Sequence, residues 1–179
     1  MRSRCAADRV GDLTIGSGAT LTGGGVRLKY LEKGWALLPL RLLIGFGFAA
    51  HGYAKLSRGP ESFGAILASL GVPQPQLMAW ATSLLEFLGG MSLMAGAFVV
   101  PLSLPLAFVM LIAMLSVHLP YGFSSVRLKA MTGSGAEFGP VGYEVNLLYI
   151  VGLLALVLSG PGTLSVDGWL RQRRDAARR

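Results

Sequence analysis

The sequence places two residues of opposite charge inside long apolar stretches. Arg41 falls within residues 35–54, and Glu86 falls within residues 77–120, where His118 is the only other ionisable residue. An unpaired charge inside a membrane helix costs about 3 kcal/mol, so such residues are usually paired and functional. We therefore expect Arg41 and Glu86 to form an ion pair, and we take them as the candidate catalytic residues. The pair could fix only the packing of two helices, or it could also serve a ligand.

A second group of polar residues lies at the ends of apolar stretches, on the side from which Glu86 enters. The group consists of His51, His118, Glu144 and Asn146. Charged groups that face lipid are costly, so helices packed side by side should turn these residues inward around one polar pocket. We take this pocket as the candidate substrate-binding site, with Arg41 approaching Glu86 from the opposite side.

The same residue types could serve two other chemistries, which we disfavour. His51 and His118 could ligate a haem, and together with Glu86 and Glu144 they could hold a metal ion. Histidines near helix ends more often face the wet interface, however, and no ligand spacing such as Glu-x-x-His is present. The sequence also has no Gly-rich phosphate loop, no dinucleotide fingerprint and no nucleophile elbow. Neither a haem nor a metal is therefore expected.

Apolar segments long enough to cross a membrane must position these residues. Residues 35–54 match the length of about 20 residues that crosses a bilayer. Residues 77–120 are too long for one crossing and are interrupted by Pro101 and Pro105, so they predict a helical hairpin. Residues 142–159 supply the fourth and shortest span. The predicted fold is all-α, an integral membrane four-helix bundle with short interfacial helices.

Small residues indicate where these helices pack. Gly45, Ala49 and Gly52 share one face of the first span. Gly89 and Gly90 make the second span narrow at their positions, because they have no side chain. Close contact between membrane helices needs such residues, so we interpret both sets as packing surfaces rather than ligand sites.

The short interfacial helices are expected at two places. The first shows apolar residues at intervals of three and four, namely Phe63, Ile66, Leu67 and Leu70. The second begins near Ser165, which can cap it, and carries Trp169 and an Arg-rich surface. Residues 121–141 are of mixed composition and predict no regular element.

The composition excludes a soluble domain and disfavours a nucleic-acid binder. Hydrophobic residues make up 53% of the chain and charged residues 14%, against about 25% charged in soluble domains. The mean hydropathy is +0.57. The net charge of +7 lies mainly at the two ends of the chain, whereas a nucleic-acid groove needs charges interleaved with the fold. The single cysteine, Cys5, excludes an intramolecular disulfide.

The charge pattern divides the chain into three parts and predicts its orientation. Residues 1–34 read as a disordered basic tail, 35–167 as the membrane domain and 168–179 as a second basic tail. Eleven Lys and Arg residues lie in the end segments, against four on the opposite side of the spans, Lys55, Arg58, Arg127 and Lys129. The positive-inside bias therefore places both termini in the cytoplasm.

Several short stretches resemble the DoxX family of small membrane proteins. They are HGYAKL at 51–56, LGVP at 70–73, Glu86 followed by Gly89 and Gly90, His118, GYEVNLLYI at 142–150 and GPGTLSVD at 160–167. The resemblance covers about residues 35–167. It implies a four-helix protein of the bacterial or archaeal plasma membrane, related to small subunits of thiosulfate:quinone oxidoreductase. Some relatives are described as membrane partners of redox and oxidative-stress enzymes.

The resemblance leaves the function open between two classes. In the first, the protein is the quinone-facing component of a redox complex, with Arg41, Glu86 and the histidines lining the quinone pocket. In the second, it is a non-catalytic anchor or scaffold that holds a soluble redox enzyme through its basic ends. A small-molecule transporter is disfavoured by the few helices and the lack of a repeat, although a homo-oligomer would supply more helices. Whether the protein is itself an enzyme stays open.

Overall fold

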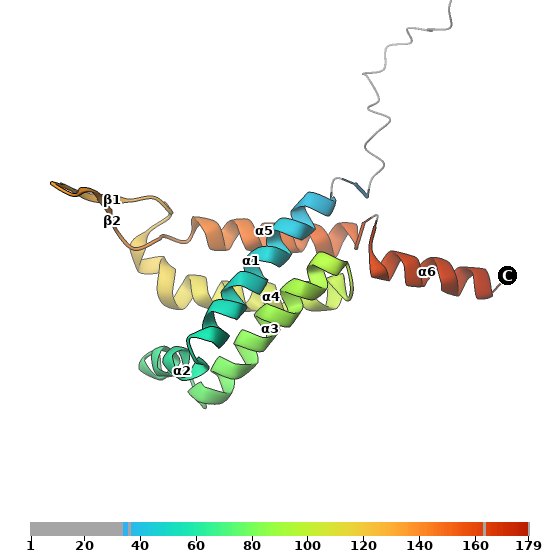
Figure 1. Ribbon diagram of the computed structural model, residues 1–179, viewed down its shortest axis with the longest axis horizontal. Coiled ribbons are helices and arrows are strands. Elements are labelled where there is room, and N and C mark those ends of the chain that lie inside the picture. The colour runs from blue at the N-terminus through green and yellow to red at the C-terminus, as the bar shows by residue number, and fades with distance from the viewer. Residues whose placement is uncertain (1–33, 36, 163, 179) are drawn as a thin grey trace, which may run out of the picture. The chain divides into compact units, whose positions relative to one another are not determined.

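The computed structural model describes residues 34–35, 37–162 and 164–178. The tail predicted to be disordered falls almost entirely on residues 1–33, which lie outside the described residues, so it stays a prediction. In chain order the elements are α1 Leu37–Ser57, α2 Pro60–Ser69, α3 Pro75–Ala95, α4 Val99–Ala113, the π-helical turn η1 Met114–His118, the 3-10 turn η2 Leu119–Tyr121, β1 Leu128–Thr132, β2 Gly135–Phe138, α5 Glu144–Ser159 and α6 Val166–Ala177. The predicted mostly helical membrane fold is confirmed (Figure 1).

Three helical runs are long and apolar enough to cross a membrane. They are Leu37–Ser57, Pro75–Ala95 and Val99–Tyr121. The predicted fourth span corresponds to α5, which has 16 residues. At 1.5 Å per residue α5 is about 24 Å long, shorter than a hydrocarbon core of about 30 Å. The protein is a multi-pass membrane protein whose fourth helix is the shortest of the bundle.

Helices α1 and α3 pack against each other in opposite directions along a seam of residues spaced mainly three and four apart. On α1 the seam contains Gly45, Ala49, Gly52 and Lys55, and on α3 it contains Glu86, Phe87 and Gly90. A Cβ atom added to Gly45 would lie 2.7 Å from the Gly90 carbonyl oxygen. The two backbones therefore touch, which confirms that these small residues form packing surfaces.

Helices α4 and α5 form a second pair, in which α4 contacts α3 and α5 contacts α1. The ring of Tyr149 on α5 packs edge-on against Phe48 on α1, with centroids 5.3 Å apart. Gly152 lies against the Ile44 side chain of α1. Phe48 has no exposed surface, so the contact between the two pairs forms part of the apolar core.

The break between α3 and α4 is not where the prolines predict it. The chain turns at Gly96, whose φ of +71° suits a residue without a side chain, and α4 then runs through both prolines. Pro101 lies in the first turn of α4, where a missing N–H group costs little. Pro105 lies inside the helix. A membrane helix tolerates such a proline because neighbouring groups satisfy the freed carbonyl.

The segment 121–141 contains a β-hairpin that the sequence analysis did not predict. Its strands β1 and β2 are antiparallel, and Thr132 pairs with Gly135 across the two-residue loop of Gly133 and Ser134. Every residue of both strands is exposed. A strand without a buried face shows no alternation of apolar and polar residues, so the periodicity that usually indicates a strand is missing.

Candidate functional site

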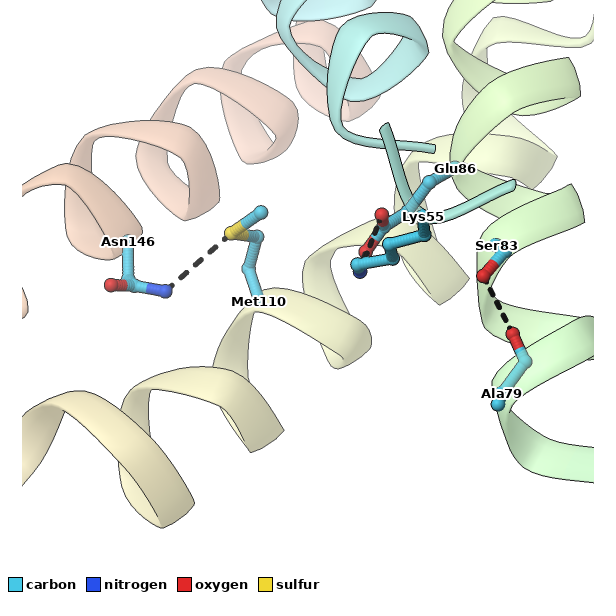
Figure 2. Close-up of polar contacts among 6 residues, drawn as sticks. All are labelled: Lys55, Ala79, Ser83, Glu86, Met110 and Asn146. Carbon is cyan, nitrogen blue, oxygen red and sulfur yellow. Dashed lines mark hydrogen bonds and ion pairs between the residues drawn. The ribbon is translucent and has the colours of Figure 1, made fainter. Parts of the chain in front are cut away.

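The core of the α1–α3 seam holds a buried ion pair between Lys55 and Glu86. The Lys55 Nζ atom lies 2.7 Å from Glu86 Oε1 and 2.6 Å from Oε2 (Figure 2). The Glu86 side chain is 2% exposed and that of Lys55 is 25% exposed. It is the only ion pair within the described part of the chain. Glu86 is therefore enclosed by protein, while its partner can be reached from one side.

The predicted pair between Arg41 and Glu86 is wrong. The contact between Gly45 and Gly90 fixes the register of the two helices, and Arg41 then lies beside Gly96 rather than beside Glu86. Ten residues separate Gly96 from Glu86, which is about 15 Å along a helix. The position of a residue within its own apolar stretch contains no information about the register of two packed helices.

Arg41 instead binds main-chain carbonyls of the segment 160–167. Its Nη1 atom donates to the Pro161 carbonyl, and its Nη2 atom donates to the Leu164 carbonyl at 2.8 Å. The Arg41 side chain is 1% exposed. The intramembrane cation is thus held by carbonyl dipoles, and we assign it a role in positioning the chain rather than in chemistry.

Asp167 completes this junction, which we call the clasp (Arg41, Gly96, Pro161, Leu164 and Asp167). The Asp167 carboxylate accepts hydrogen bonds from the amides of Phe98 and Val99, at 2.9 and 3.0 Å. These are the first amides of α4, which an acidic side chain caps favourably. The Asp167 amide donates to the Gly96 carbonyl at 3.0 Å. The clasp therefore ties the start of α6 to the turn between α3 and α4.

The polar pocket predicted around Glu86 does not form. His51 is exposed, and His118 lies with its Nδ1 atom 2.9 Å from the Val141 carbonyl. Glu144 accepts a hydrogen bond from the Ser125 amide at 3.0 Å. Each of these side chains has its own local environment, and among the described residues only Lys55 is recorded as a hydrogen-bond donor to Glu86.

Asn146 is the one residue of the predicted group that is buried. Its Nδ2 atom lies 3.6 Å from the Met110 sulfur, between α5 and α4 (Figure 2). A thioether is a weak acceptor, so this contact is weaker than an ordinary hydrogen bond. Within the described residues, no three His, Cys, Asp or Glu side chains lie close enough together to hold a metal ion.

Lys55 is the partner of Glu86 that the sequence analysis missed. It was counted among the charges outside the spans, because the first apolar stretch ends at Ala54. The spacing of the seam contains the signal, since Lys55 follows Gly52 by three residues on the face that begins with Arg41. Its Nζ atom also lies 4.5 Å from the centre of the Phe63 ring on α2. A cation at this distance from an aromatic ring is attracted to it.

Comparison with known proteins agrees with this architecture. The DoxX family model matches residues 36–119, which include both members of the ion pair and the helices from α1 to α4. Residues 36–119 form a DoxX domain. No curated protein and no solved structure matches the chain. In this DoxX-domain protein the hairpin, α5 and α6 lie outside the matched residues.

The ion pair gives the DoxX domain one place where a proton can be held inside the bundle. An ionised carboxylate only accepts hydrogen bonds, and an ammonium only donates them, so the pair offers both functions side by side. Ser83, one turn before Glu86, uses its hydroxyl proton to bond the Ala79 carbonyl at 2.7 Å (Figure 2). Lys55 is therefore the donor recorded at Glu86, and it is the more exposed member of the pair.

Proposed function

We propose that this DoxX-domain protein is the quinone-facing membrane component of a redox or oxidative-stress complex. The observation that supports the proposal is the Lys55–Glu86 pair, which places an acceptor and a donor of protons inside an apolar helix bundle. Ionisable pairs in membrane segments are costly and mark sites of function more often than sites of packing alone.

In this proposal Lys55 donates a hydrogen bond to a carbonyl oxygen of the quinone ring. Glu86 holds and passes a proton, and the Phe63 ring beside Lys55 offers an apolar face for the quinone. Reduction of a quinone to a quinol takes up two electrons and two protons. A soluble redox enzyme in the complex supplies the electrons, and the aqueous phase supplies the protons through the pair. Arg41 acts indirectly, through the hydrogen bonds of the clasp. His51, one turn before Lys55 on α1, lines the path by which the quinone approaches Lys55.

Co-purified quinone tests this function. We expect the protein purified in mild detergent to carry quinone in near-stoichiometric amount, measured by solvent extraction and chromatography. The double variant Lys55→Met/Glu86→Leu should lose it, because the hydrogen-bonding groups are gone while the charge balance is kept. The matched control is Arg58→Met/Glu61→Leu, which changes the same residue types at exposed positions and should retain quinone. Equal quinone content in the two double variants would contradict the proposal.

A second function, a membrane anchor for a soluble redox enzyme, is favoured by α6. This helix extends from the clasp, carries Arg171, Arg173 and Arg174, and has no buried residue. A basic exposed helix suits an acidic protein surface. The same purification distinguishes the two functions, since an anchor would co-purify with a soluble enzyme and would carry no quinone.

We propose further that the protein lies in a bacterial or archaeal plasma membrane with both termini in the cytoplasm. The excess of Lys and Arg in the end segments supports this orientation. Reporter fusions test it: a reporter that is active only in the cytoplasm should work after Arg179 and fail at Gly133, in the loop of the hairpin. Activity at Gly133 would overturn the orientation.

A further inference from the structure

An open cavity of about 370 Å³, whose lining residues are mostly exposed, lies at the base of the β-hairpin. It is lined by Tyr121, Arg127, Leu128, Lys129, Gly139 and Pro140. Its volume falls within the range of small-ligand sites. It contains none of the residues considered above for the quinone site, and all six of its lining residues lie beyond the part of the chain that the DoxX model matches.

Two cations line this cavity without a counter-ion. They are Arg127, just before β1, and Lys129, at the irregularity of the strand pairing between Leu128 and Ala130. Neither forms an ion pair with any residue that the structure describes. The nearest acid in the ladder, Glu137, pairs with Ala130. The cavity therefore carries two cations that have no ion-pair partner among the described residues.

The walls of the cavity are held in place by hydrogen bonds at its base. The Gly139 amide donates to the Arg127 carbonyl at 2.8 Å, which joins the two ends of the hairpin. The His118 ring lies 2.9 Å from the Val141 carbonyl, which joins the end of α4 to the segment after β2. The cavity is therefore built into the fold and does not depend on a ligand to form.

Glu144 and Gly142 support the same base from the start of α5. The Glu144 carboxylate accepts from the Ser125 amide at 3.0 Å, and the Gly142 amide donates to the Ser124 carbonyl at 3.1 Å. A Cβ atom at Gly142 would lie 2.6 Å from that same carbonyl oxygen, so the chain needs a glycine there. Two residues first predicted for a pocket in the bundle, His118 and Glu144, thus act as positioning residues for this cavity.

The cavity also lies at the end of a membrane-spanning segment. Tyr121, one of its walls, is the last residue of the apolar run Val99–Tyr121. Tyrosine is enriched at this level of the bilayer, where lipid phosphates are concentrated. Arginine and lysine recognise phosphate through charge-assisted hydrogen bonds, and a tyrosine hydroxyl can add another. We propose that this cavity binds an anionic phosphate group, with Arg127 and Lys129 as its counter-ions.

Binding measurements on the full chain in neutral detergent test this site. The probes are dihexanoyl-phosphatidylglycerol, dihexanoyl-phosphatidylcholine and inorganic phosphate, measured by titration calorimetry. We expect the anionic lipid to bind at least about tenfold more tightly than the zwitterionic one, as two cations near a membrane surface would produce. Arg127→Gln/Lys129→Gln should remove this preference. The control Arg171→Gln/Arg174→Gln makes the same change of charge on α6 and should keep the preference for the anionic lipid.

The outcomes also distinguish the source of the phosphate group. Competition by inorganic phosphate, with the lipid bound more tightly, identifies a lipid headgroup as the ligand. Binding of inorganic phosphate without binding of the anionic lipid supports the same anion site with a soluble ligand. The proposal is overturned if Arg127→Gln/Lys129→Gln, with the thermal unfolding of the native chain, binds both anions as tightly as the native protein does.

Discussion

The Lys55→Met variant is expected to unfold with a free energy about 3 kcal/mol lower than that of the native protein. Removing Lys55 leaves the Glu86 carboxylate enclosed at 2% exposure without its counter-ion. Replacing Glu86 by Gln should cost less, because Lys55 is 25% exposed, lies near the end of α1 and can turn its ammonium toward water. Unfolding in detergent, followed by circular dichroism, measures the difference.

Two further variants make this expectation specific. Lys55→Met/Glu86→Leu should recover most of the lost stability, because neither residue of the former ion pair then carries a charge. Arg58→Met removes a cation three residues further on, at an exposed position, and should change stability by less than about 0.5 kcal/mol. If Lys55→Met and Arg58→Met have the same stability, the ion pair does not form in the folded protein.

Adjacent glycines of α3 are expected to respond very differently to alanine. A Cβ atom at Gly90 would lie 2.5 Å from the Gly45 carbonyl oxygen and would also meet the Ala49 amide, and both belong to the backbone of α1. Backbone atoms cannot turn aside, so Gly90→Ala must push the helices apart. We expect a loss of about 3 kcal/mol, the upper end for overpacking.

Gly89→Ala is the matched control for this prediction. Its Cβ atom would meet the end of the Leu106 side chain at 3.3 Å, and a leucine methyl can shift by a few tenths of an ångström. Alanine is also the better helix former, so the net change should stay within about 1 kcal/mol. Thermal unfolding of both variants in the same detergent compares them. Equal losses at the two positions would show that α1 does not pack on the Gly90 face of α3.

Much of the helical architecture could be predicted because length and hydropathy act locally. The stretch 35–54 and the run 77–120 predict spans without any knowledge of their neighbours, and the faces with Gly45 and Gly90 indicate packing surfaces. The position of the α3–α4 turn was not predictable from the prolines, since Pro101 is compatible with the first turn of a helix. The turn depends on Gly96, one of many glycines in the chain.

The site could not be predicted to the same extent because it depends on register. Arg41 and Glu86 have opposite charges and similar depths, yet the backbone contact of Gly45 with Gly90 places them apart and brings Lys55 to Glu86. Periodicity identifies the face of a helix but not its displacement along a neighbour. The hairpin had a turn signal at Gly133, but its strands bury no side chain and left no pattern to detect.

The clasp has a consequence for the order of events during synthesis. The carbonyls that accept from Arg41 lie 120 and 123 residues later in the chain. At about 5–20 residues per second, translation needs on the order of ten seconds to produce them after Arg41. During that time the guanidinium has neither acceptor, and α1 cannot settle at its final depth without leaving a buried cation unsatisfied. The first helix to enter the bilayer is therefore the one whose placement is completed last, when the ribosome has made the segment before α6.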